Sequence, residues 1–329
     1  MAKRFSATTA ALAGWNLLGR EPASVAVWGL VALVLMIAPL IGLYVPLLSQ
    51  IQQMAELNRD VTASQDPAVF GQFMAMQMRL MLINLTTSGL QILVQTLLAA
   101  AIFRAVLEPQ ARRWFYLRVG ASEGWMLLLS VIALIGFYIV YAVALIAGVL
   151  VGALAYFATG KLLGITIGVL TVIGGLVAIV WAMLRLSMAW PMTFAGRRLV
   201  LFESWALTKG SSLRLFGMAV LAVLLVMAVE MVLGVVVLIV FALTMAGTWS
   251  ALSKVSGLDE LLHLLWPWLL AAAPILALLQ SIVLTIYIAP WASAYQQLTA
   301  TAAGEAAAPP PPPAPPEPPL ESGPEATPA

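Results

Sequence analysis

Long apolar stretches separated by short polar segments dominate the chain. Six of them reach or exceed the roughly 20 residues that a helix needs to cross the hydrocarbon core of a bilayer. They lie at about 23–48, 79–103, 125–157, 162–190, 213–246 and 266–295. Nothing in them alternates with the period of two that a barrel strand requires. The pattern therefore predicts an all-α, polytopic helical membrane bundle of about six transmembrane helices.

The composition agrees with this pattern. The 329 residues are 62% hydrophobic and only 9% charged, against roughly a quarter in an average soluble domain. A formal net charge of +2 without a dense basic stripe predicts no nucleic-acid partner. The chain has no cysteine, which excludes disulfides and thiolate metal sites. The amino-terminal segment lacks the compact apolar core of a signal peptide, and we expect it to be retained.

The basic residues predict the orientation, because Lys and Arg next to spans accumulate on the cytoplasmic side. One side of the predicted bundle carries twelve of the sixteen: Lys3, Arg4, Arg20, Arg104, Arg112, Arg113, Arg118, Arg185, Arg197, Arg198, Lys209 and Arg214. The other side carries Arg59, Arg79, Lys161 and Lys254. This bias predicts a multi-pass protein of the bacterial cytoplasmic (inner) membrane with both termini in the cytoplasm.

The third and fourth spans are separated only by residues 159–161, which predicts a tight helical hairpin. Both spans carry glycines four residues apart, namely Gly148 and Gly152 on the third and Gly160, Gly164 and Gly168 on the fourth. Such spacing lets helix backbones approach closely. The glycines serve either the packing of these two spans or a dimer seam, and the short connection favours the first use.

Three similar segments precede the first, third and fifth spans. Each combines a Trp, basic residues and a short amphipathic stretch with a glycine that we expect to make the turn: Gly19, Gly120 and Gly210. This predicts three copies of an interfacial elbow helix followed by a helical hairpin, at about 5–103, 109–190 and 197–295. The periodicity puts two sets of side chains on shared helical faces: Phe5, Leu12 and Trp15 in the first elbow, and Leu199, Phe202 and Ala206 in the third.

The elbow chemistry suits helices that lie in the membrane plane, with Trp rings at headgroup depth and basic side chains on anionic lipid. The candidate headgroup residues are Trp15, Arg20, Arg112, Arg113, Trp114, Arg118, Arg197, Arg198, Trp205 and Lys209. Ordinary loops with aromatic-belt and topology signals are the alternative interpretation. Membrane lipids are the expected partners, with other membrane proteins or a second copy of the chain as further alternatives.

Glu230 is the most unusual residue, because it lies near the middle of the fifth span. A carboxylate there is costly unless it is protonated, paired or facing water. Arg185 is a candidate partner, although its place near the end of the fourth span also suits a side chain that reaches the interface. Glu230 therefore either couples to a proton or substrate, or is a neutral side chain that is hydrogen-bonded to another helix.

The second span carries a polar face. Asn84, Ser88, Gln91 and Gln95 recur at spacings of four, three and four residues, and Gln280 adds polarity to the sixth span. These side chains either line a hydrated cavity or bond neighbouring helices. The second interpretation is favoured, since such bonds are common in helix bundles.

The sequence contains few residues that could form a catalytic site. The only histidine, His263, lies within one helical turn of Asp259 and Glu260, and these offer too few ligands for zinc. No Ser/His/Asp set and no phosphate-binding glycine loop can be assembled. We therefore expect no enzyme activity, no metal and no cofactor. The Pro-rich segment 301–329 predicts a disordered cytoplasmic tail after a transmembrane domain at 1–300.

Two of the elbows carry a resemblance. RAVLEPQARRWFYLRVGASE (104–123) and SWALTKGSSLRLFG (204–217) resemble the cytoplasmic elbows of a family of bacterial six-span proteins. That family is related to the membrane domain attached to some glycerophosphoryl diester phosphodiesterases and to YciC-like inner-membrane proteins. The resemblance covers about residues 5–300 and implies a six-helix inner-membrane protein. It does not imply the phosphodiesterase activity, which belongs to a separate soluble barrel in those relatives.

These observations favour a non-catalytic integral membrane protein that acts as a scaffold or as a lipid-interacting, regulatory component of the cell envelope. The alternative is a small-molecule or lipid transporter with a cavity around Glu230 and the polar face of the second span.

Overall fold

The computed structural model describes residues 5–37, 67–245 and 258–306, together with Pro39, Gly42 and Val255. These residues form helices and their connections, with no strand among them, which confirms the all-α bundle. Within them, five helices are long and apolar enough to cross a membrane, and a bent pair of shorter helices makes six if it counts as one span. This architecture fits an integral membrane protein.

The long helices are α5 (Pro67–Leu107), α6 (Ala121–Thr159), α7 (Lys161–Leu186), α10 (Ser212–Met245) and α12 (Leu258–Ala306). The short elements are α1 (Ala7–Ala11), α2 (Ala13–Arg20), α3 (Pro22–Ala32), the π-helix η1 (Leu33–Ile37), the turn η2 (Arg113–Tyr116), α8 (Ala189–Gly196) and α9 (Glu203–Leu207).

The second to sixth predicted spans each correspond to one long helix, and α5 and α12 extend well beyond the predicted bounds. The first predicted span is described as α3 and η1, and most of it beyond Ile37 lies outside the described residues. Helix α12 continues to Ala306, so residues 301–306, which the sequence assigned to the tail, are helical. Residues 307–329 lie outside the described part of the chain.

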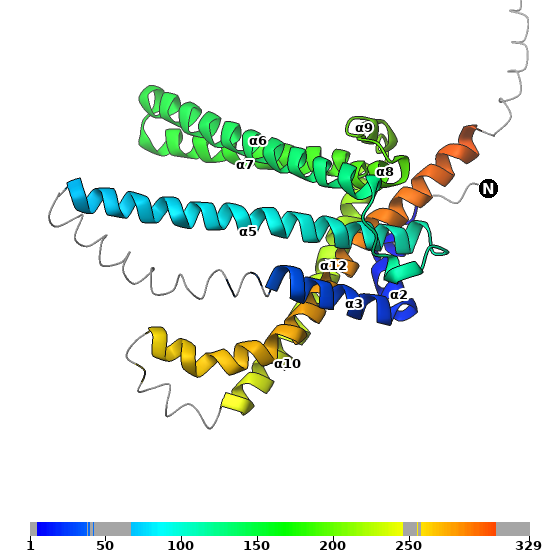
Figure 1. Ribbon diagram of the computed structural model, residues 1–329. Helices are drawn as coiled ribbons and strands as arrows, with labels where there is room; N and C mark the ends of the chain where they lie inside the picture. The colour runs from blue at the N-terminus through cyan, green and yellow to red at the C-terminus, as the bar shows by residue number, and fades with distance from the viewer. Residues whose placement is uncertain are drawn as a thin grey trace, which may run out of the picture.

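Figure 1 shows that the short elements gather at one end of the molecule. We call this region the convergent end: it comprises α1, α2, α3, η2, α8 and α9 with the adjoining ends of α5, α6, α7, α10 and α12. Away from it the long helices spread apart, and α6 and α7 remain together as a hairpin (Figure 1). The clusters of buried hydrophobic side chains are built mainly from these elements.

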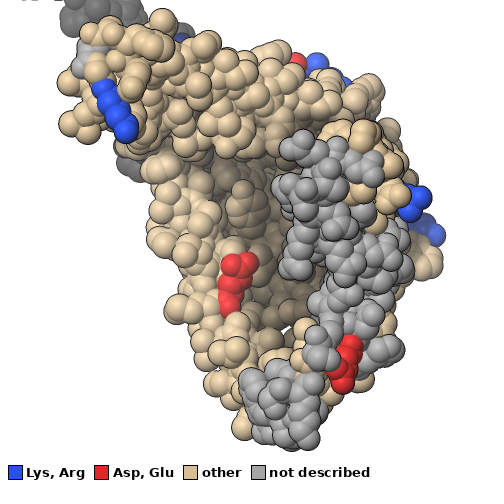
Figure 2. All heavy atoms as spheres, turned by 90° about the vertical axis from the view of Figure 1, so that its left-hand side faces the viewer, with Lys and Arg blue, Asp and Glu red and all other residues tan. Residues whose placement is uncertain are grey.

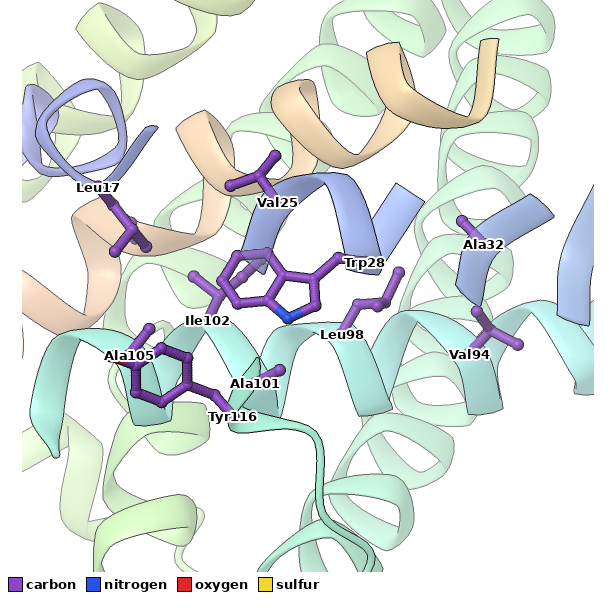
Figure 3. Packing of buried hydrophobic residues seen from close by; sticks show 11 residues of the cluster. Leu17, Val25, Trp28, Ala32, Val94, Leu98, Ala101, Ile102, Ala105 and Tyr116 are labelled. Atoms are coloured by element: carbon purple, nitrogen blue, oxygen red, sulfur yellow. The ribbon is translucent and has the colours of Figure 1, made fainter. Parts of the chain in front are cut away.

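The largest cluster lies where α3 crosses α5. It consists of Leu17, Val25, Trp28, Ala32, Val94, Leu98, Ala101, Ile102, Ala105, Tyr116 and Ala289. In Figure 3 the Trp28 ring lies between α3 and α5, close to Leu98 and Ile102. The indole nitrogen of Trp28 donates a 2.9 Å hydrogen bond to the Phe115 carbonyl, so the buried ring keeps a partner for its one polar atom.

The first elbow turns into the first span at Glu21 and Pro22, where α2 and the following helix meet at 98°. Glu21 has φ −131° and ψ 51°, which ends α2. Pro22 takes the first position of α3, where its missing N–H leaves no hydrogen bond unmade. The prediction that Gly19 makes this turn is wrong, because Gly19 lies inside α2. Gly210, by contrast, has φ 81° just before α10, a conformation that favours glycine.

The predicted shared face of the first elbow is also wrong. Phe5 is buried, whereas Leu12 and Trp15 are exposed. The helix is interrupted at Leu12, between α1 and α2, and this break shifts the phase on which the expectation depended. The inward side carries small residues instead: a Cβ on Gly14 would lie 2.5 Å from the Ile286 Cα, so α2 packs directly on the backbone of α12.

The other two elbows depart further from the predicted helices. The second contains only the four-residue turn η2. In the third, Leu199 and Phe202 lie outside any helix and Ala206 lies in the five-residue α9, so the three share no helical face. All three are exposed. The three segments therefore occupy equivalent places before their hairpins without sharing one local structure.

The α6–α7 hairpin turns at Gly160, which has φ 92°. Its two glycine series face each other: a Cβ on Gly152 would lie 3.0 Å from the Gly168 Cα, and one on Gly148 would meet the Val172 side chain. This close approach needs residues without side chains. The glycines at 148, 152, 164 and 168 thus serve packing within the hairpin.

Replacing Gly164 with Ala is expected to destabilise the hairpin by roughly 1–3 kcal/mol, the usual cost of overpacking. The new Cβ would lie 2.4 Å from the Tyr156 Cα, so one helix has to shift. Thermal unfolding in detergent measures the effect. Gly174→Ala is the matched control in the same helix, because a Cβ there meets no described atom within 4 Å. Equal melting temperatures for the two variants would contradict this packing.

Candidate functional site

One buried ion pair joins four elements of the convergent end. Arg104 at the end of α5 donates hydrogen bonds to the Glu123 carboxylate in the first turn of α6 and to the Tyr116 carbonyl in η2. Its guanidinium also lies 5.4 Å from the ring centroid of Phe194 in α8. Arg104 and Glu123 are only 5% and 4% exposed. From sequence, Arg104 was predicted only as an orientation signal, because no local pattern links it to Glu123, 19 residues away.

A second acidic residue is turned inward at the bend between α2 and α3. Glu21 accepts a 3.1 Å hydrogen bond from the Ser24 hydroxyl and a 3.3 Å bond from the Tyr116 hydroxyl. The Nε atom of Arg112 lies 3.2 Å from Glu21 Oε2, the same oxygen that accepts from Ser24. Glu21 is buried and Arg112 is mostly exposed. The carboxylate therefore faces the core and its cationic partner faces outward.

The turn η2 has an unusual backbone. Trp114, Phe115 and Tyr116 have φ values of 54°, 54° and 65°, in the left-handed region that side chains other than glycine rarely adopt. Such strain persists only where the surroundings hold it. Here Trp28 donates to the Phe115 carbonyl and Arg104 to the Tyr116 carbonyl. The turn thereby buries Tyr116 completely and leaves Trp114 73% exposed.

Arg185 anchors the third elbow to the end of α7. Its guanidinium lies 5.4 Å from the Trp181 ring centroid and 5.6 Å from that of Trp205, and the two rings meet edge to face. The Ser204 hydroxyl donates a 2.7 Å hydrogen bond to the Arg185 carbonyl. Arg185 therefore belongs to the convergent end, and within the described residues it forms no ion pair with Glu230.

The exposed charge of the convergent end is largely basic. We define its basic face as the exposed side chains of Arg20, Arg112, Arg113, Arg118, Arg197, Arg198, Lys209 and Arg214. Among the described residues, these make two ion pairs, Arg112–Glu21 and Arg198–Glu203. The aromatic rings of Trp15, Trp114 and Trp205 are exposed in the same elbows. Basic residues mixed with exposed indole rings are typical of the headgroup layer of a membrane.

A pocket lies between α10, α12 and η1, away from this face. Its volume is about 300 Å³, and its lining consists of Met36, Glu230, Leu233, Gly234, Val237, Leu276, Leu279, Gln280 and Val283. Figure 2 shows that this side of the molecule is hollowed and that an acidic side chain lies on the wall among uncharged atoms. Two candidates from separate spans, Glu230 and Gln280, are thus brought into one site, which we call the Glu230 pocket.

The polar face of α5 is not part of the Glu230 pocket. Asn84, Ser88 and Gln91 are exposed on α5, and Gln95 is half-buried. The Asn84 amide donates a 3.1 Å hydrogen bond to the Leu80 carbonyl of its own helix. The polar face of α5 and Glu230 therefore do not line one cavity, as the transporter alternative predicted.

Asp259, Glu260 and His263 lie at the start of α12, and the side chains of Asp259 and His263 are outside the described part. Within the described residues, no group of three or more His, Cys, Asp or Glu side chains could hold a metal ion.

Comparisons of the chain with protein-family models, curated proteins and solved structures find no match.

Replacing Arg104 with Met is expected to cost about 3–5 kcal/mol of folding free energy, because it leaves Glu123 buried without its cation. Unfolding in mixed micelles measures the cost. Arg198→Met is the matched control: it breaks an exposed ion pair, and such pairs contribute little. The double variant Arg104→Met/Glu123→Leu should recover part of the loss. An Arg104→Met variant as stable as Arg198→Met would show that the buried pair does not hold this end together.

Proposed function

We propose that this protein is a non-catalytic integral protein of the bacterial cytoplasmic membrane, and that its basic face binds the headgroups of anionic lipids on the cytoplasmic side. In this role it serves as a scaffold or regulatory component of the cell envelope. One observation carries the proposal: Glu21 and Glu123 are turned inward into buried contacts, whereas most basic side chains of the same elbows are exposed and without an ion pair among the described residues.

The energetics favour anionic lipid as the partner. A Lys or Arg close to an anionic membrane surface contributes about 1 kcal/mol of attraction. Several such residues on one rigid end therefore add up to a substantial preference for anionic over zwitterionic headgroups. The buried contacts of Arg104 and Glu21 support this role, because they fix the elbows before any lipid binds and so reduce the entropy lost on binding.

The distribution of charge supports the orientation. Arg79 and Lys161 lie toward the other end of the bundle, so most of the described basic residues share the convergent end. The start of the described chain also meets the last turns of α12 there, since the Ser6 amide donates a 2.9 Å hydrogen bond to the Gln297 side chain. The positive-inside rule then favours a cytoplasmic location for both. The resemblance of segments 104–123 and 204–217 to elbows of bacterial six-span proteins is consistent with this assignment.

Neutralising two residues of the basic face tests the proposal. Arg113→Gln/Arg118→Gln is expected to weaken retention of phosphatidylglycerol at least about fivefold, since two attractive charges are lost. Competition between fluorescent phosphatidylglycerol and phosphatidylcholine in nanodiscs measures this preference. Arg79→Gln/Lys161→Gln removes the same charge from the other end and should leave it unchanged. An equal loss in both variants would mean that overall charge, and not the basic face, sets the preference.

Transport is the second candidate, and the Glu230 pocket is the observation that favours it. In a transporter, the substrate site that opens in turn to the two sides of the membrane is expected at a polar pair within otherwise apolar spans. A site of this kind has to be reached from water on at least one side.

The natural absence of cysteine allows a direct test of water access. If the pocket serves transport, Glu230→Cys should react with a membrane-impermeant thiol reagent. Val232→Cys is the matched control, because Val232 is exposed on the same helix but does not line the pocket. Reactivity of Glu230→Cys from both sides of the membrane supports transport. If Glu230→Cys reacts from neither side of the membrane, transport through this pocket is ruled out, and the headgroup proposal is unaffected.

A further inference from the structure

The Glu230 pocket has a chemistry of its own. Glu230 lies sixteen residues after Arg214 on α10, or about 24 Å along the helix axis at 1.5 Å per residue. Residues 231–245, which complete α10 beyond it, are all uncharged, so its carboxylate lies well inside a long apolar segment. Around it the pocket offers one other polar side chain, the amide of Gln280, and the rest of the lining is apolar or glycine.

The carboxylate has no partner within the described residues: no ion pair or hydrogen bond reaches Glu230 from them. The side chain is exposed on the pocket wall. An unpaired carboxylate at this depth is unfavourable until a proton or a cation joins it. The lining of the pocket therefore supplies no positive charge to balance this carboxylate.

The backbone around the pocket is irregular in two places, and a glycine adds space beside them. Met36 comes from the π-helix η1, a rare form that is frequent at functional sites. Pro274 interrupts the hydrogen bonding of α12 just before the lining residues Leu276 and Leu279. Gly234 lies one turn after Glu230, and a Cβ there would meet no described atom within 4 Å. These three features keep open a space that regular helices with larger side chains would close.

We propose that the Glu230 pocket binds an amphiphile that carries a single protonated nitrogen, such as an alkylamine or an amine-bearing lipid. The ammonium group pairs with the Glu230 carboxylate and donates a second hydrogen bond to the Gln280 amide oxygen. The apolar chain lies against the side chains of α10 and α12. A volume of about 300 Å³ is at the lower end of the range for small-molecule sites. The proposal is independent of headgroup binding, which concerns the opposite part of the molecule.

A pair of photoreactive probes tests this assignment. A twelve-carbon alkylamine with a diazirine in its chain is compared with the alcohol of the same length, using the full-length protein in nanodiscs of zwitterionic lipid. Mass spectrometry of the labelled peptides locates the adducts. We expect the amine to label residues 230–237 or 276–283, and the alcohol to label them much less. Equal labelling by both probes, or no labelling of these segments by the amine, overturns the proposal.

Two variants test separately the charge of Glu230 and the open volume of the pocket. Glu230→Gln keeps the shape and is expected to lower amine labelling at least about tenfold, because the ammonium loses its only counter-charge among the residues that line the pocket. Glu203→Gln removes the same charge from an exposed elbow and should have no effect. Unchanged labelling of Glu230→Gln overturns the proposal.

Gly234→Leu leaves Glu230 intact and fills the space, so it should lower labelling by both probes. Gly136→Leu is the matched control, since a Cβ on Gly136 also meets no described atom within 4 Å but the residue lies in α6, outside the pocket. Gel filtration verifies that each variant stays monodisperse. If the two leucine variants label equally, the amine does not occupy this space and the proposal falls.

Discussion

The contact between Arg104 and Glu123 is the interaction on which the convergent end depends. Burying two charges is expensive, and the attraction between them offsets this cost only where further polar partners complete the site. Arg104 has such a partner in the Tyr116 carbonyl, and the Phe194 ring packs against it. The same guanidinium thereby holds the left-handed turn that directs Trp114 outward. One ion pair thus fixes both the packing of the helices and the outward orientation of Trp114 in the second elbow.

Hydrocarbon explains why tight packing is confined to one end. In lipid, an apolar helix gains little by exchanging lipid for protein, so large side chains can stay at the surface. The long helices follow this rule: α6 and α10 expose most of their Val, Ile and Leu side chains. The α6–α7 hairpin is the exception, because its glycines allow backbone contact. Where the chain has to hold a defined shape, it uses small residues and buried polar groups.

Sequence reasoning reached the features that depend on local pattern. Apolar run length located the long helices, and the short link at Gly160 identified the hairpin. It failed where a single residue changes the phase, as at Leu12, and where an all-aromatic turn adopts positive φ without glycine. It also could not foresee contacts such as Tyr116 with Glu21, which lie 95 residues apart. The sequence singles out Glu230 as unusual and Gln280 as a polar residue of the sixth span, but only the fold shows that they face one space.

The first and last parts of the chain depend on each other. Gly14 packs on the Ile286 backbone, the Ser281 hydroxyl donates to the Val25 carbonyl, and Ser6 bonds to Gln297. During synthesis α12 leaves the ribosome after every other described helix, so α2 and α3 wait without their final neighbour while the intervening helices are inserted. Assembly of this protein is therefore completed by its carboxyl-terminal helix, and in a chain that is truncated before residue 281 the first helices keep α5 as a neighbour but lose these contacts with α12.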